Sequence, residues 1–146
     1  MMELEGMFIR EKVIRAVRLF FEERDFHEVI TPTLNAHIPL EPTLYPFTTT
    51  WQTQEGEKTF FLSTSPEKGL KKMLAAGVGK CFAISKCFRN LESAGPLHNP
   101  EFLMLEWYRE NARMGDIMSD VESLISFCME KLVYEGPAFG SEKKWP

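Results

Sequence analysis

The feature that most constrains the fold is a pair of mostly apolar stretches, residues 81–89 and 102–109, separated by a short polar loop. Each stretch is long enough for a strand, and a short connection favours antiparallel pairing of the two. Side chains alternate between the faces of a strand. In the first stretch Phe82, Ile84 and Phe88 share one face, with Lys86 as the exception. In the second stretch Leu103, Leu105 and Trp107 share one face.

The opposite faces carry functional groups. The first stretch presents the small residues Ala83, Ser85 and Cys87 and ends in Arg89; the second presents Phe102, Met104, Glu106 and Tyr108. A buried carboxylate costs several kcal/mol unless a cation or hydrogen-bond donors meet it. If the large apolar sides pack together, a guanidinium, an aromatic ring, a carboxylate and a phenol share one surface. Such a surface suits a phosphate, a base and an amine. The pattern leaves an ordinary cross-strand pair of Arg89 with Glu106 equally open.

The remaining periodicity predicts a mixture of helices and strands, which is an α+β fold. Helical spacing predicts a helix over about residues 6–24 and another over about 116–132. Extended segments are expected at 26–30 and, as a hairpin with a turn at 54–57, at 47–51 and 59–63, after a proline-rich loop at 35–46. The apolar positions of the last predicted helix are Ile117, Val121, Leu124, Ile125, Cys128 and Leu132.

A short helix is predicted to start at Ser65. Ser65 suits the N-cap, Pro66 the first helical position and Glu67 the first turn. Gly77 suits the C-terminal stop. The inner face predicted for this helix consists of Leu70, Met73 and Leu74.

Composition narrows the class of protein. A length of 146 residues fits one domain, and 44% hydrophobic with 26% charged residues is typical of a soluble globular protein. A net charge of -4 argues against a dominant nucleic-acid-binding role. Three cysteines without a CxxC pair predict reduced thiols and a cytoplasmic protein, and three scattered histidines argue against a zinc site. We find no signal peptide and no run long enough for a membrane span.

The region from Phe88 to Tyr108 resembles motif 2 of the class II aminoacyl-tRNA synthetases, in the lysyl subgroup. The matching residues are Phe88-Arg89-Asn90, His98-Asn99-Pro100-Glu101-Phe102 and Leu105-Glu106-Trp107-Tyr108. Residues 26–34 resemble motif 1, residues 44–49 the segment after it, and residues 62–67 the amino-acid-binding segment. Within the subgroup the chain is most similar to elongation factor P lysine ligases, paralogues of lysyl-tRNA synthetases that lack an anticodon-binding domain.

The resemblance implies an antiparallel sheet flanked by helices and a role for each matching residue. Arg89 would be the catalytic residue, holding the ATP α-phosphate and the substrate carboxylate. Phe102 would stack on adenine and Glu92 would lie near it. His98 would contact the phosphates or the ribose region, and Asn99 would also bind ATP. Loop capping for His98 and core packing for Phe102 are the alternatives. The residues implied for the substrate's amino groups and the pocket around them are Ser65, Glu67, Glu106 and Tyr108.

Ser65 has two interpretations. Elongation factor P lysine ligases have serine at this position, whereas lysyl-tRNA synthetases tend to have alanine. A hydroxyl there would change the polarity of the pocket, as a choice between α- and β-lysine requires. A helix N-cap explains the same serine, and the two roles are compatible.

The match stops before motif 3. Nothing after Leu132 resembles that segment or its ATP-binding arginine, and the acidic Mg²⁺ ligands of the family are also missing. The loop from Asn90 to Leu97 has no basic residue, which puts the contact with the γ-phosphate in doubt. We therefore expect a partial catalytic domain over residues 1–146 without an anticodon-binding domain, and favour a piece of a longer gene over a naturally shortened paralogue.

Three functions follow from the resemblance. The first is ATP- and Mg²⁺-dependent activation of lysine or β-lysine and its transfer to elongation factor P, by a homodimer formed through the motif 1 region. The second is a lysyl-tRNA synthetase fragment, which the net charge and Ser65 disfavour, so that tRNA is not the expected partner. The third is an inactive paralogue that binds a partner or dimerises. In each case the chain alone is expected to be nearly inactive.

Overall fold

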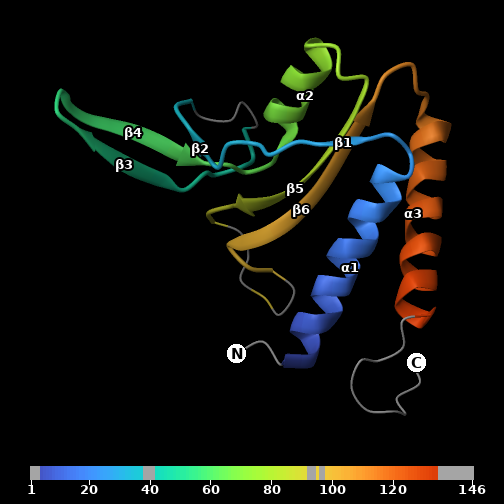
Figure 1. Ribbon diagram of the computed structural model, residues 1–146. Helices are drawn as coiled ribbons and strands as arrows, with labels where there is room; N and C mark the ends of the chain where they lie inside the picture. The colour runs from blue at the N-terminus through green and yellow to red at the C-terminus, as the bar shows by residue number, and fades with distance from the viewer. Residues whose placement is uncertain (1–3, 38–41, 92–94, 96–97, 135–146) are drawn as a thin grey trace. The chain divides into compact units, whose positions relative to one another are not determined.

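A computed structural model describes residues 4–37, 42–91, 95 and 98–134 of the chain (Figure 1). These residues form helices and strands in mixed order, which confirms the predicted α+β class. The elements are α1 (Leu4–Glu22), β1 (His27–Glu28), β2 (Leu34–Asn35), β3 (Thr48–Thr53), β4 (Gly56–Leu62), α2 (Glu67–Ala75), β5 (Lys80–Phe88), β6 (Glu101–Arg109) and α3 (Met114–Tyr134). They divide into two compact units, residues 27–110 and the flanking segments that carry α1 and α3.

The strands β5 and β6 form the centre of the unit spanning residues 27–110. They pair antiparallel along their whole length, with Ala83 opposite Glu106 and Cys87 opposite Phe102. This is the pairing that the alternation of the sequence predicts. On the other side of β5, β1 pairs in parallel. The extended segment predicted at 26–30 is therefore a strand of only two residues, although the Val29 N–H continues the pairing by donating to the Phe82 carbonyl at 2.8 Å.

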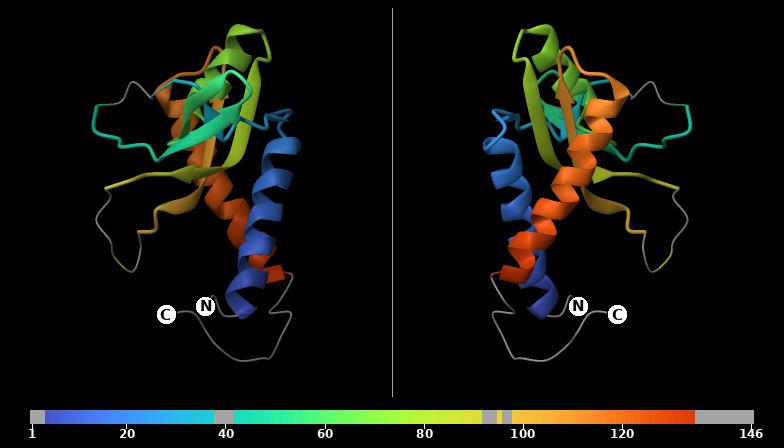
Figure 2. Two further views of the ribbon diagram at one scale, coloured as in Figure 1. Left: turned by 90° about the vertical axis from the view of Figure 1, so that its left-hand side faces the viewer. Right: turned by 90° about the vertical axis from the view of Figure 1, so that its right-hand side faces the viewer.

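The predicted hairpin is present as β3 and β4, joined by a two-residue turn at Gln54 and Glu55. With β2 it makes a second sheet in the order β2-β4-β3, and the hairpin extends away from β5 and β6 within this unit (Figures 1 and 2). Both strands are longer than predicted. The proline-rich segment 35–46 begins inside β2, and its residues 38–41 lie outside the described part of the chain.

The start of α2 differs from the prediction by one residue. The N-cap is Pro66, which within the described residues has no side-chain capping bond. The Ser65 hydroxyl accepts only a long hydrogen bond, 3.4 Å, from the Glu67 N–H. The assigned helix therefore begins one residue later than predicted, with Pro66 as N-cap, although Pro66 already has helical angles (φ -79°, ψ -3°) and the bond from the Glu67 N–H keeps part of the predicted capping by Ser65.

The predicted stop at Gly77 is confirmed by its backbone geometry. Gly77 has φ +89°, and its N–H donates to the Leu74 carbonyl while the Val78 N–H donates to that of Met73. These two bonds form a Schellman motif, which needs a residue in the left-handed region just after the helix. Glycine adopts that conformation without steric cost.

The helix α2 packs against the small-residue face of β5. Leu70, Cys81 and Ala83 are fully buried, and Leu74 and Tyr108 pack against them. Small side chains on β5 leave room for a helix close to the strand, so α2 reaches the same face as Glu106. Met73, predicted to face inward, is 36% exposed, because it lies about 100° around the helix from Leu74.

In the other unit, α1 and α3 lie side by side and run in opposite directions (Figure 2). Phe20 contacts Phe21 and Phe127 edge-to-face with ring centroids 5.1 and 5.7 Å apart, and Arg24 stacks 3.8 Å from the centroid of Phe20. Of the apolar residues of α3, Leu124 is buried, whereas Val121 and Ile125 are 38% and 59% exposed. No helix in the described part of the chain is sufficiently long and apolar to cross a membrane.

Gly69 of α2 provides a test of this packing. Alanine normally stabilises a helix interior by about 0.5–1 kcal/mol relative to glycine. Here an added Cβ would lie 2.5 Å from the Thr31 Cγ2, and Thr31 is held by a 2.9 Å hydroxyl bond to Ser85. We therefore expect Gly69→Ala to lower the free energy of unfolding by about 1–2 kcal/mol in denaturant titrations.

The control is Thr31→Ser, which keeps the hydroxyl and removes the methyl group. The double variant Gly69→Ala/Thr31→Ser should recover most of the lost stability. A Gly69→Ala single variant more stable than the wild type would contradict the close contact.

Candidate functional site

The register of β5 and β6 gathers the side chains predicted to share one face. Directly opposite residues of an antiparallel pair point to the same side of the sheet. Cys81 therefore lies beside Tyr108, Ala83 beside Glu106 and Cys87 beside Phe102. Arg89 follows β5 directly. Its backbone N–H donates to the Pro100 carbonyl at 3.1 Å, which extends the pairing by one step beyond Phe88.

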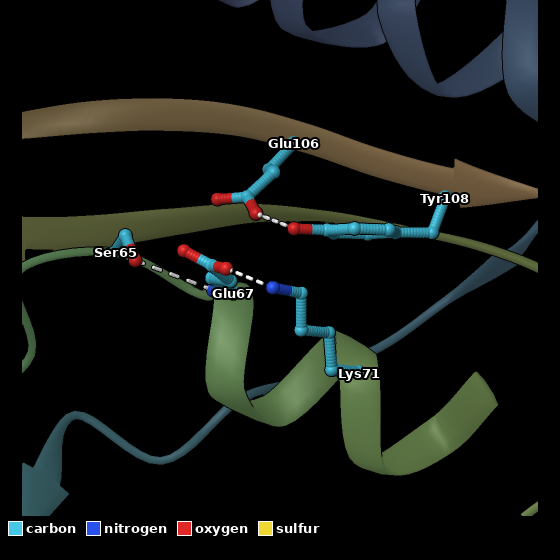
Figure 3. Close-up of polar contacts among 5 residues, drawn as sticks. All are labelled: Ser65, Glu67, Lys71, Glu106 and Tyr108. Carbon is cyan, nitrogen blue, oxygen red and sulfur yellow. Dashed lines mark hydrogen bonds and ion pairs between the residues drawn. The ribbon is translucent and has the colours of Figure 1, made fainter. Parts of the chain in front are cut away.

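Glu106 and Tyr108 are joined by a hydrogen bond. The Tyr108 hydroxyl donates to the Glu106 Oε1 at 2.7 Å (Figure 3). Burial raises the pKa of the Tyr108 phenol well above its usual range, and the bond to Glu106 and the charges of Glu106 and Glu67 raise it further. The phenol therefore stays protonated and acts as a donor over the whole physiological pH range. The carboxylate of Glu106 consequently has a fixed partner on one of its oxygens.

Glu67 brings a second carboxylate to the same place from α2. It stands in the first turn of the helix, below Glu106 in the view of Figure 3. Its charge is near enough to raise the pKa of Tyr108. The Glu67 Oε1 accepts a hydrogen bond from the Lys71 ammonium one helical turn later, and Ser65 lies just before the helix. Two carboxylates and one phenol thus lie near one another, an arrangement that suits the binding of an amine.

Arg89 and Phe102 form a second cluster on the same face. The Arg89 guanidinium carbon lies 5.4 Å from the centroid of the Phe102 ring, within the range of a cation–π contact. The Arg89 Nε–H donates to the Thr64 carbonyl at 3.3 Å, which ties it to the segment before α2. An aromatic ring beside a guanidinium suits a base next to a phosphate. A direct pair of Arg89 with Glu106 stays an open interpretation.

Cys87 shows that the two clusters are neighbours. Its side chain is fully buried. Burial raises the pKa of the Cys87 thiol to about 11, with Arg89 lowering it and Glu106 raising it. Both charges therefore act on one thiol. All three cysteines are free, and the raised pKa of each thiol makes all three poor nucleophiles.

The loop residues predicted for ATP contacts are not part of these clusters. His98 and Asn99 are exposed, and the His98 N–H donates to the Gly95 carbonyl at 3.1 Å. Glu92 lies outside the described residues. Their contacts with ATP stay a prediction.

The sequence analysis did not identify two residues that contact the candidate site residues. Lys71 could have been found, because it stands four residues after Glu67 in a predicted helix, where opposite charges meet. Thr64 acts through its backbone carbonyl, for which the sequence has no signal.

The described residues contain no group of three His, Cys, Asp or Glu side chains that could hold a metal ion. No chemical step is therefore assigned to Mg²⁺. An open groove of about 650 Å³ runs along α1, lined by residues such as Met7, Arg15 and Arg18. It contains none of the candidate site residues, which all lie within residues 27–110.

Comparison with protein families identifies the class of protein. The chain matches the family described as tRNA synthetases class II (D, K and N) over residues 4–143. The match covers nearly the whole sequence, including both clusters and the segment between them. The chain therefore belongs to the class II tRNA synthetase family.

The curated relatives point to one branch of the family. An "Elongation factor P--(R)-beta-lysine ligase" of Haemophilus influenzae strain PittGG is 45% identical over 125 residues, covering 84% of this chain and 38% of the relative. The protein of that name from strain KW20 / Rd is 48% identical with the same coverage, and that of Mannheimia succiniciproducens is 44% identical over 124 residues. The chain thus spans about two fifths of the length of these relatives.

The raised pKa of Tyr108 predicts a pH-dependent stability. A group whose pKa is higher in the folded than in the unfolded state stabilises the fold at pH values below its unfolded-state pKa, which is 10.0 for this phenol. That stabilisation is lost as the pH rises above 10.0 and toward the folded-state pKa. At neutral pH, Tyr108→Phe should lower the free energy of unfolding by about 1–2 kcal/mol, because a hydrogen bond to a charged group is lost.

Chemical unfolding of both proteins at several pH values tests this. The difference between wild type and Tyr108→Phe should shrink as the pH rises above about 10. A difference that stays constant across that range would show that the phenol is not held protonated by the fold.

Proposed function

We propose that the protein activates lysine or β-lysine with ATP and transfers it to a lysine of elongation factor P. The observation that carries the proposal is the convergence of Glu67 and Glu106 on Tyr108. Two carboxylates in one place suit a substrate with two ammonium groups. The names of relatives that are 40–48% identical support elongation factor P as the acceptor.

The proposed reaction has two steps. In the first, an oxygen of the amino-acid carboxylate forms a bond with the α-phosphorus of ATP, and the bond to pyrophosphate breaks. In the second, the amine of the acceptor lysine attacks the acyl carbon, AMP leaves and the amine loses a proton. No oxidant or reductant is needed in either step.

Arg89 would act in the first step. Two negative groups, the carboxylate and the α-phosphate, must approach each other, and negative charge grows on the phosphate oxygens as they do. A guanidinium held in place before the reaction lowers that barrier without reorganisation. The contacts of Arg89 with Thr64 and Phe102 support this role because they orient the guanidinium beside a ring on which adenine could stack.

Replacement of Arg89 tests the activity. In the protein expressed from its complete gene, Arg89→Ala should reduce ATP–pyrophosphate exchange with lysine or β-lysine by about a hundredfold or more. The exposed Arg10 on α1 provides a control, since Arg10→Ala removes the same charge elsewhere. Near-normal exchange by Arg89→Ala, with a normal circular dichroism spectrum, would refute the role.

The acceptor decides between the ligase and the second candidate, a lysyl-tRNA synthetase. Labelled lysine or β-lysine should appear on elongation factor P and not on tRNA. Charging of tRNA with α-lysine would favour the second candidate. A protein with neither activity would favour the third, an inactive binding or dimerising paralogue.

Ser65 is the proposed determinant of the choice between α- and β-lysine. Its hydroxyl lies next to Glu67, one of the two proposed amine ligands. We expect Ser65→Ala to shift the ratio of kcat/KM for the two substrates by about fivefold or more, the scale of one lost hydrogen bond. An unchanged ratio would remove Ser65 from the list of specificity residues.

Three further features belong to the same proposal. ATP would arrive with Mg²⁺, the protein would act as a homodimer through residues 26–34, and it would work in the cytoplasm. Sedimentation of the complete protein tests the proposed oligomeric state, and a dimer is expected.

A further inference from the structure

The two carboxylates of the candidate amine site are held in a similar way. One oxygen of Glu106 accepts a hydrogen bond from Tyr108, and one oxygen of Glu67 accepts a hydrogen bond from Lys71. Figure 3 shows that the second oxygen of each carboxylate points away from its donor, and that both second oxygens point toward the same side. The two donors come from different elements, β6 and α2.

Without a partner, such an arrangement would be unfavourable. Glu67 and Glu106 both act on the same phenol, so their charges lie close together and repel each other. A glutamate also has three rotatable side-chain bonds and would otherwise turn toward water. The Lys71 ammonium supplies one opposite charge and orients the Glu67 carboxylate through its hydrogen bond.

The exposure of this ion pair suits exchange with a substrate. The Lys71 side chain is 59% exposed and that of Glu67 37% exposed. Exposed ion pairs four residues apart on a helix contribute little to stability. Lys71 can therefore keep one oxygen of Glu67 while the other accepts a hydrogen bond from a second ammonium group, at little cost to the fold.

We propose that Lys71 is a positioning residue of the amine site, which holds Glu67 so that its second oxygen receives an ammonium group of the substrate. This inference rests on the proposed function, because it assumes that Glu67 binds a diamino acid. It differs from that function in assigning a role to a residue that does not itself contact the substrate.

The test compares two lysines of the same helix. Lys71→Met and Lys72→Met each remove one positive charge from α2, and the structure gives an ion pair with Glu67 to Lys71 alone among the described lysines. In exchange assays on the protein from its complete gene, Lys71→Met should raise the KM for lysine or β-lysine by about three- to tenfold, since one charged hydrogen bond is weakened. The KM for ATP and kcat should stay within about twofold, because Lys71 does not touch the reacting atoms.

The matched variants make the outcome decisive. Lys72→Met should resemble the wild type, and Lys71→Arg should restore most of the lost affinity because arginine also reaches one turn back. Equal effects of Lys71→Met and Lys72→Met would overturn the inference, and so would a fall in kcat without a change in KM.

Substrate analogues distinguish a positioning role of Lys71 from a general distortion of the site. Norleucine lacks the side-chain amine of lysine and 6-aminohexanoate lacks the α-amine, so only one of them presents the ammonium that Glu67 would bind. Lys71→Met should weaken inhibition by one analogue and leave the other unchanged. Equal weakening of both would indicate a distorted site and contradict the inference.

A calorimetric titration with lysine distinguishes failure of the inference from failure of the proposed function. If the wild type neither binds lysine nor catalyses exchange, the proposed function fails and the inference with it. If the wild type binds lysine and Lys71→Met binds it equally well, the inference alone fails.

Discussion

The antiparallel register of β5 and β6 is the constraint on which the candidate site depends. A shift of one residue would move every side chain of one strand to the opposite face. Glu106 and Tyr108 would then point away from Cys81 and Ala83, and Phe102 would leave Arg89. The backbone bond from Arg89 to Pro100 extends the pairing beyond the last paired residues and so helps to hold this register.

The second requirement is close approach of α2 to the same face. Cys81 and Ala83 are small enough to admit Leu70, and the missing side chain of Gly69 admits Thr31. Glycine lowers the conformational stability of the helix through its backbone entropy. It also lets α2 approach closely enough for Glu67 to lie near Glu106. Packing of small residues and placement of a charged one are therefore parts of the same arrangement. A larger residue at position 69, 81 or 83 would move α2, and with it the Glu67 carboxylate, as well as the core.

Sequence alternation was sufficient for the β5–β6 part of the site, because period two in two neighbouring strands leaves few arrangements. It correctly placed Glu106 and Tyr108 together. It was less informative about helices, since α3 carries apolar residues on more than one side. Val121 and Ile125 could not be distinguished from Leu124 by spacing alone. Family resemblance supplied the roles of Arg89 and Glu67, which no local pattern contains, and those roles stay predictions.

Electrostatics explains how the proposed amine site can be compatible with a stable fold and still suit a cation. Each carboxylate accepts a hydrogen bond from the protein, from a neutral phenol for Glu106 and from an ammonium for Glu67. The phenol adds no charge of its own to Glu106, while Lys71 offsets the charge of Glu67. The pair therefore carries close to one net negative charge rather than two. Such an arrangement would suit an amine, and it imposes less repulsion on the fold than two unpaired carboxylates would.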